Sequence, residues 1–267
     1  MAKPLTALPW FGGKSRYLDF LLPLMPQTKV YVEPFGGGAS ILLNRPRSRT
    51  EVYADMDERL VNFLTEVRNN PALMDRLIRT TPFSRRQLTS DVGPDPEGDS
   101  TEDARRFFAG LHSSYSGTGR NEDYVNWARR KSTQVPRFAQ DWMAVSKRLH
   151  GVELRYDDAF AVMRDHDTSR TVFYVDPPYL RTTMKSGHEG MYAHGFHSVE
   201  QHKELLDFLD GLRGHVCLSG YQSELYDDRL KAPRWVRYDN VPKKVTVNHA
   251  RIDASVRVES AWVKQAR

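Results

Sequence analysis

The segment FYVDPPYL, residues Phe173–Leu180, places an acid, two prolines and a tyrosine directly after an apolar run typical of a buried strand. Prolines cannot donate to a sheet and tend to end strands, so Asp176 is expected just beyond a strand end. The carbonyls of Pro177 and Pro178 are expected to be free, because no proline nitrogen can satisfy them. A carboxylate and a carbonyl together accept both hydrogens of an exocyclic amino group, and the Tyr179 ring can stack on the base that carries it. Such acceptors leave the amine lone pair pointing outward, which is preorganised electrostatic catalysis. An ordinary turn after a strand is the alternative.

This chemistry requires no cysteine nucleophile. The single cysteine, Cys217, lies inside the apolar stretch HVCLSG and is interpreted as a small buried hydrophobe in a strand. One cysteine allows no internal disulfide. Its isolation also argues against chemistry at C5 of cytosine.

A glycine cluster upstream predicts a cofactor site. The β-rich run Thr28–Ser40 ends in EPFGGGAS. The cluster consists of Gly36, Gly37 and Gly38. Glycines directly after a strand let the backbone approach a ligand at the carboxyl edge of a sheet. An acid about 20 residues on, at the next strand end, commonly binds ribose hydroxyls, and Asp55 and Asp57 are the candidates. Glu33 is a polar group expected near the other end of the ligand. These features predict a nucleoside-bearing cofactor, although the third glycine of G-x-G-x-x-G is missing; a turn needed only for packing is the alternative.

Two further segments carry polar and aromatic side chains without an obvious scaffold role. In LPWFGGKSRYL, Trp10 is a candidate contact to an apolar part of the cofactor and Lys14 a candidate neighbour of a carboxylate. An N-terminal cap over the sheet is an equally good interpretation. The loop Met184–His197 contains several histidines but no acid or cysteine partners beyond one glutamate, so it favours a lid over the substrate, and no metal site is predicted.

The elements between these motifs alternate between strands and helices. Strands are predicted at Val152–Tyr156 and Thr171–Val175. A short strand is also predicted at Thr50–Asp57, and Asp57 is a predicted N-cap of the helix that follows it. Ser198 and Gln201 form a predicted capping box. The end of the chain is expected to form antiparallel strands. This order predicts an α/β fold with a mostly parallel sheet covered on both faces.

One stretch breaks this alternation. Residues 89–101 are acidic and rich in proline and glycine, and residues 102–150 are basic and aromatic. We therefore predict a catalytic domain from residues 1–82 and 151–267, with residues 83–150 as an inserted subdomain. A net charge of +5 and a pI of about 9.2 are compatible with a phosphate-rich partner. A helical subdomain that serves only packing is the alternative.

Composition limits the class of protein. Apolar residues make up 39% of the 267 residues, enough for a full core, so intrinsic disorder is excluded. No apolar run approaches the ~20 residues of a membrane helix, and the N-terminus lacks a signal-peptide pattern. We therefore expect a cytoplasmic protein without membrane contact. No obligate protein partner is evident, which is compatible with a monomer.

Taken together, these stretches resemble the Dam-type (D12 class) DNA adenine-N6 methyltransferases, over most of the chain and in the family's order. The sequences PWFGGK, EPFGGGAS, ADMD and VDPPY stand where the family has its N-terminal cofactor motif, glycine motif, ribose acid and catalytic motif. The resemblance implies a Rossmann-like methyltransferase sheet, S-adenosyl-L-methionine as methyl donor and no metal. The implied cofactor contacts are Trp10, Lys14, Phe35, Gly36, Gly38, Asp55 and Asp176. The implied catalytic group around a flipped adenine is Asp176, Pro177, Pro178 and Tyr179. Asp158, or its neighbour Asp157, is a candidate acceptor from the cofactor's adenine.

The same resemblance makes the inserted segment a DNA-recognition domain with double-stranded DNA as partner. SSYSGTGRNE resembles the family's recognition loop, with Tyr115, Gly117 and Arg120 in matching places. Arginine is suited to bidentate contact with guanine, and a tyrosine can stack into the gap that a flipped base leaves. Ser116, also a candidate DNA contact, stands where the family commonly has asparagine, so GATC is only one candidate target.

Two alternatives to adenine-N6 methylation stay open from the residues. One is the same chemistry on cytosine N4, an RNA adenine or a protein glutamine; aspartate before the prolines favours adenine by resemblance. The other is a non-catalytic DNA-binding relic, against which the intact glycine, acid and D-P-P-Y sets argue. Restriction–modification and a solitary methylase both fit the sequence.

Overall fold

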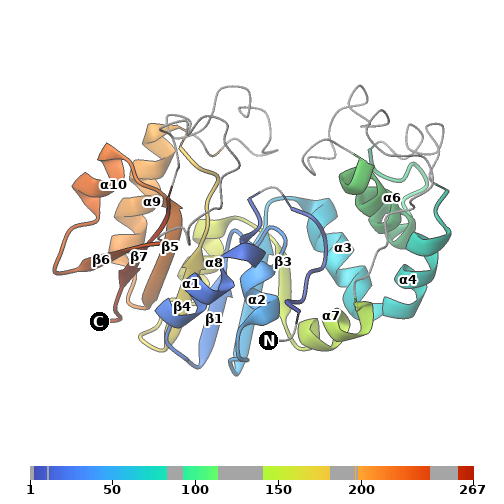
Figure 1. Ribbon diagram of the computed structural model, residues 1–267, viewed down its shortest axis with the longest axis horizontal. Coiled ribbons are helices and arrows are strands. Elements are labelled where there is room, and N and C mark those ends of the chain that lie inside the picture. The colour runs from blue at the N-terminus through green and yellow to red at the C-terminus, as the bar shows by residue number, and fades with distance from the viewer. Residues whose placement is uncertain are drawn as a thin grey trace, which may run out of the picture.

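The computed structural model describes residues 3–10, 12–82, 93–113, 141–180, 196, 198–240 and 258–267. Within these ranges the chain forms a seven-stranded sheet with the order β3-β2-β1-β4-β5-β7-β6 (Figure 1). The strands are β1 Val30–Glu33, β2 Thr50–Asp55, β3 Glu153–Tyr156, β4 Thr171–Val175, β5 His215–Tyr221, β6 Trp235–Asp239 and β7 Glu259–Lys264.

The strand directions divide the sheet into two parts. Strands β3, β2, β1, β4 and β5 are parallel, whereas β7 runs antiparallel to both β5 and β6. The chain moves outward from β1 to β2 and β3, then returns to place β4 directly beside β1. Ligands of open α/β sheets bind outside the carboxyl ends of the strands at such a reversal. The loops that follow β1 and β4 therefore define where a site is expected.

Helices cover both faces of the sheet. The helical elements are η1 Lys14–Arg16, α1 Leu18–Leu21, η2 Leu22–Leu24, α2 Ser40–Asn44, α3 Glu58–Asn69, α4 Pro71–Thr80, α6 Ser100–Ser113, α7 Trp142–Leu149, α8 Ala159–Asp165, α9 Val199–Gly211 and α10 Glu224–Arg229. Alternate residues of β4 belong to different cores: Val172 and Tyr174 pack with α1, α2, α3, α6 and α7, and Phe173 and Val175 pack with α8, α9 and α10. This period of two is the side-chain alternation of a strand buried on both sides. Figure 1 shows α9 and α10 beside β5–β7, and α4, α6 and α7 grouped at the far end of the molecule.

Several local predictions are confirmed. Strand β4 has the predicted bounds, and β6 and β7 are antiparallel. The Asp57 carboxylate accepts from the backbone N–H groups of Arg59 and Leu60 and caps α3. Ser198 and Gln201 form the predicted capping box of α9. The first strand is shorter than the β-rich run Thr28–Ser40, because proline and glycine follow Glu33.

The described ends of the predicted insert pack on α3. Phe63 of α3 stacks on Phe108 of α6 with ring centroids 5.5 Å apart, and it meets Trp142 of α7 edge-on at 5.9 Å. Phe108 and Trp142 also contact each other at 5.5 Å. These three rings belong to the same hydrophobic core as residues of the sheet, so α6 and α7 pack against the catalytic domain. The division of the chain into domains at residues 83 and 150 stays a prediction.

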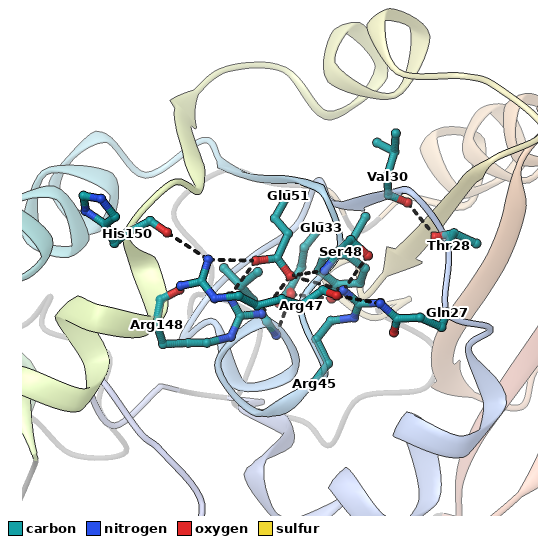
Figure 2. Close-up of polar contacts among 12 residues, drawn as sticks. Gln27, Thr28, Val30, Glu33, Arg45, Arg47, Ser48, Glu51, Arg148 and His150 are labelled. Atoms are coloured by element: carbon teal, nitrogen blue, oxygen red, sulfur yellow. Dashed lines mark hydrogen bonds and ion pairs between the residues drawn. The ribbon is translucent and has the colours of Figure 1, made fainter.

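Helix α7 is also joined to β2 through a buried carboxylate, Glu51 (Figure 2). The Arg148 guanidinium donates to both Glu51 oxygens, at 2.6 and 2.9 Å, and Arg45 donates to one at 3.3 Å. Arg47 donates to backbone carbonyls at the end of α7, including that of His150 at 2.9 Å. Glu51 lies near the amino end of β2, so this network stands at the opposite edge of the sheet from the loops that follow β1 and β4.

Candidate active site

Asp176 follows β4 directly, and two donors from separate parts of the chain fix its carboxylate. Lys14 Nζ donates to Oδ2 at 2.6 Å, and Ser219 Oγ of β5 donates to Oδ1 at 2.8 Å. Ser219 is itself 3.0 Å from the Tyr174 hydroxyl. The Asp176 side chain stays 17% exposed, whereas Lys14 is 5% exposed. Lys14 and Ser219 thus fix the orientation of the Asp176 carboxylate, which remains partly exposed to solvent.

Lys14 links the N-terminal segment to this carboxylate. Its ammonium also donates to the Gly12 carbonyl at 2.9 Å and lies 3.8 Å from Glu259 Oε1. Burial lowers the pKa of Lys14, but the carboxylates of Asp176 and Glu259 outweigh this effect, and the pKa is raised above its ordinary value. Lys14 is therefore a buried cation at neutral pH, and the carboxylate beside it belongs to the protein itself.

Tyr179 is held by its hydroxyl and by its ring. The hydroxyl donates to Glu259 Oε1 at 2.8 Å, and the Tyr221 ring lies edge-on with centroids 4.6 Å apart. Lys14 Nζ lies 5.1 Å from the Tyr179 ring centroid. Burial raises the pKa of the Tyr179 hydroxyl well above its ordinary value, with Asp176 and Glu259 adding to the rise, so the hydroxyl keeps its proton and donates.

Glu259 is a residue of this site that the sequence motifs missed. It begins β7 in the stretch VESAWVK, which predicted only an antiparallel strand. Nothing in this stretch distinguished Glu259 from the other polar residues of the strand, Ser260 and Lys264. Burial raises the pKa of Glu259 to about 7, against the opposing effect of Lys14.

One of the two proline carbonyls is already engaged. His202 of α9 is fully buried, and its Nε2 lies 3.0 Å from the Pro178 carbonyl oxygen. Because a carbonyl only accepts, Nε2 donates, and a neutral ring then accepts at Nδ1 from the Tyr226 hydroxyl at 2.9 Å. The expectation of two free carbonyls is therefore wrong for Pro178. No donor to the Pro177 carbonyl is present among the residues that the structure describes.

The glycine loop is tied to the end of β2. Gly37 N donates to Asp55 Oδ2 at 2.9 Å, and the Tyr53 hydroxyl donates to the Gly37 carbonyl at 2.7 Å. Gly37 has φ +47°, in the left-handed region that favours glycine. Asp55 Oδ1 accepts from Asp57 N at 2.9 Å. Of the two acids predicted to bind ribose, Asp57 caps α3 and Asp55 faces the glycine loop.

Trp10 packs on the glycine loop. A Cβ at Gly37 would lie 2.7 Å from Trp10 Nε1, and one at Gly38 would lie 2.9 Å from Trp10 Cβ. The indole also lies near the Phe107 ring of α6, with centroids 6.4 Å apart. The N-terminal segment therefore covers the loop through Trp10 and reaches Asp176 through Lys14.

The other cofactor candidates occupy neighbouring strand ends. Asp158 follows β3 and accepts from Ala161 N at 3.0 Å, which caps α8. Asp157 is paired with Arg155 instead, and this hydrogen bond is the main reason that the pKa of Asp157 is lowered. The Phe35 ring contacts the Phe196 ring, with centroids 5.6 Å apart.

Glu33 is bonded to partners within the fold. Its Oε2 accepts from the Tyr31 hydroxyl at 2.6 Å and from Leu42 N of α2 at 3.0 Å. The side chain is buried, and burial raises its pKa to about 8. It anchors α2 to β1, and its place near the other end of the ligand stays a prediction.

Several predicted residues lie outside the described ranges. They are Tyr115, Ser116, Gly117 and Arg120 of the recognition loop and His188, His194 and His197 of the predicted lid. Over the part of the chain that is described, no group of three or more histidine, cysteine, aspartate or glutamate side chains has the arrangement to hold a metal ion. In the same ranges no helix combines the length and apolar character needed to cross a membrane.

Comparison with known proteins identifies the family. The profile of the D12 class N6 adenine-specific DNA methyltransferases matches residues 10–240. A DNA adenine methylase from Serratia marcescens is 26% identical over 251 residues, which cover 85% of this chain and 87% of that protein. The Escherichia coli protein yhhF, provisionally named a methyltransferase, aligns at 8% identity with a TM-score of 0.40 over 95% of this chain and 85% of its own. Because the family profile extends from Trp10 through β6, the chain belongs to the D12 class N6 adenine-specific DNA methyltransferases.

Proposed function

We propose that Asp176–Tyr179 hold the target adenine and that the neighbouring strand ends hold S-adenosyl-L-methionine. The observation that carries this proposal is the pairing of β1 with β4, in which Val32 is the register partner of Phe173. The glycine loop and the D-P-P-Y segment therefore leave the sheet from adjacent strands at one edge. A methyl donor and an amine acceptor bound to these two loops are neighbours, as direct transfer requires.

The acceptor side supplies the groups that an adenine amine needs. Asp176 is fixed by Lys14 and Ser219, and the Pro177 carbonyl has no competing donor among the described residues. These two acceptors can take both N6 hydrogens while the Tyr179 ring stacks on the base. An adenine inside a duplex cannot reach such a site, so the target base is flipped out of double-stranded DNA.

The donor side fits S-adenosyl-L-methionine by the chemistry of its acceptors. When bound, this cofactor supplies the methyl group as part of a sulfonium. Asp55 ends β2 and Asp158 follows β3, and carboxylate oxygens are acceptors suited to the hydroxyl and amine donors of this cofactor. Gly36 and Gly38 bring the backbone close to the ligand, with Trp10 and Phe35 as apolar contacts.

DNA contacts are assigned to the segment between α6 and α7. Residues Tyr115, Ser116 and Arg120 lie on it, and we propose them as contacts in and beside the major groove. The packing of α6 and α7 against α3 supports this proposal. These two helices flank the segment, and α3 is the helix that follows Asp55 and Asp57.

Substitution of Asp176 tests the acceptor site. Asp176→Ala should slow transfer of radiolabelled methyl to DNA by roughly 10²–10³-fold, because one of the two N6 acceptors is removed. DNA affinity should change by less than about threefold, since phosphate contacts dominate it. Asp207→Ala, at an exposed acid of α9, is the control. Full activity of the Asp176 variant would contradict the proposal.

The base and its context can be read in a second experiment. The chain is expressed in a host without DNA methylation, and the genome is sequenced by a method that detects modified bases. We expect N6-methyladenine in one short motif. Methylation of cytosine N4 would contradict the acceptor assignment.

A further inference from the structure

Glu259 lies in the candidate active site but beyond the residues that the family profile matches. It begins β7, which runs antiparallel between β5 and β6, and only 3% of the residue is exposed. Its carboxylate is 2.8 Å from the Tyr179 hydroxyl and 3.8 Å from Lys14 Nζ. A buried acid is costly unless it is paired, so these two contacts account for its presence in the fold.

We propose that Glu259 is a positioning residue of the acceptor site, which sets the Tyr179 ring through its hydroxyl and holds the Lys14 ammonium together with Asp176. This inference rests on the proposed function, because it assumes that the Tyr179 ring stacks on the target adenine. Glu259 itself need not touch the base.

The geometry explains why Tyr179 requires such support. The tyrosine follows two prolines beyond the end of β4, in a stretch without helix or strand. Its ring orientation is fixed by the Tyr221 ring on one side and by Glu259 at the hydroxyl. Tyr221 and Glu259 are register partners across β5 and β7, so one rung of the sheet provides both contacts.

Charge gives Glu259 a second effect. The charged and titratable groups that face it are Lys14 from η1, Asp176 and Tyr179 after β4, and Tyr221 of β5. Lys14 alone balances Asp176, so an ionised Glu259 makes the cluster net negative. A net negative charge favours the positive charge that develops on the adenine nitrogen as its lone pair attacks the methyl group. Because the pKa of Glu259 is raised to about 7, this charge is gained or lost near neutral pH.

Three variants separate the two effects. Glu259→Gln keeps an acceptor for the Tyr179 hydroxyl but carries no charge, Glu259→Ala keeps neither, and Tyr179→Phe keeps the ring without its hydroxyl. Each variant is assayed for kcat and KM with DNA between about pH 5.5 and 8.5. This range extends about 1.5 pH units on either side of the Glu259 pKa of about 7. DNA with 2-aminopurine at the methylated position reports base stacking by fluorescence without any turnover.

The expected results differ between the variants. Glu259→Ala should lower kcat about 10- to 100-fold with a KM for DNA within about twofold, as for loss of a hydrogen bond to a charged group. In Glu259→Gln, kcat should fall by less than about tenfold. This variant should also lack the fall in kcat below about pH 7, the acidic limb, that is expected of the wild type. Tyr179→Phe should match Glu259→Ala in 2-aminopurine fluorescence and keep the wild-type limb. Glu66→Gln, at a buried glutamate of α3, is the control and should keep the wild-type pH profile.

Specific outcomes overturn the proposal. A wild-type kcat in Glu259→Ala, equal losses in the Gln and Ala variants, or an unchanged pH limb in Glu259→Gln would each do so. If Glu259→Ala fails to fold, the pH profile of Glu259→Gln and the fluorescence of Tyr179→Phe still decide. An inactive Asp176→Ala beside unaffected Glu259 variants would reject this inference alone, whereas an active Asp176→Ala would reject the acceptor site itself.

Discussion

Replacing Gly36 by alanine is expected to destabilise the fold through a clash with one buried ring. A Cβ at this position would lie 2.0 Å from Tyr53 Cε2 and 2.5 Å from Cδ2 and Cζ. Tyr53 is fully buried in β2, and its hydroxyl bonds to the Gly37 carbonyl, so the ring cannot move away without losing that bond. Overpacking should lower the free energy of unfolding by about 1–3 kcal/mol, and loss of the hydrogen bond by about 1 kcal/mol. Alanine also restricts the unfolded chain, which offsets about 0.4–1 kcal/mol. The net loss of stability is therefore about 1–3.5 kcal/mol.

The assay is denaturant unfolding of four proteins: the wild type, each single variant and the double variant with Tyr53→Leu. Leucine lacks the ring atoms that clash, so Gly36→Ala should cost less than about 0.5 kcal/mol in that background, with a coupling energy of about 1 kcal/mol or more. Gly110→Ala is the control, because a Cβ there meets nothing within 4 Å and alanine favours a helix. The reasoning is refuted if Gly36→Ala is as stable as the wild type, or if its cost is unchanged beside Tyr53→Leu.

Three further perturbations test separate parts of the structure. Burial raises the pKa of Glu33 from 4.5 to about 8, so the folded state retains a proton that the unfolded chain releases, and stability falls as pH rises across that window. Glu33→Gln should flatten this fall by up to roughly 1.4 kcal/mol per pH unit in unfolding free energies, and parallel curves for the two proteins would reject the idea. Glu51→Ala leaves Arg148 buried without its partner and should cost about 3–5 kcal/mol in urea unfolding, several times more than Arg47→Ala at an exposed side chain; equal losses would be inconsistent with the burial. His202→Leu removes the donor to a D-P-P-Y carbonyl and should lower kcat about tenfold at unchanged DNA affinity, whereas an unchanged kcat would mean that α9 does not support this segment.

Features encoded by neighbouring residues could be predicted from the sequence. The bounds of β4 follow from an apolar run that ends in Asp176 and two prolines, and the cap of α3 follows from Asp57 before a helical pattern. The parallel sheet follows from the alternation of strands and helices. The strand bounds and the helix cap depend on chain segments of a few residues, where local sterics and hydrogen bonding decide the outcome.

Contacts between distant segments could not be predicted. Tyr179 and Glu259 are 80 residues apart and meet only because β7 enters the sheet between β5 and β6. His202 lies in α9, and nothing in its neighbours in the sequence indicated that it bonds to the Pro178 carbonyl. The same holds for Arg148 and Glu51, which are joined by folding and not by spacing. The motifs indicated which residue types gather at the site, but the order of the strands determines which of them touch.

The position of β7 has a consequence for protein synthesis. This strand is the last one described, yet it lies inside the sheet and carries the carboxylate that meets Tyr179. The glycine loop and the D-P-P-Y segment are translated before β7, so a nascent chain in which β7 has not yet emerged from the ribosome lacks this carboxylate. We therefore expect methylation to begin only after β7 has joined the sheet, and C-terminal truncations that remove β7 to leave DNA unmodified in a methylation-free host.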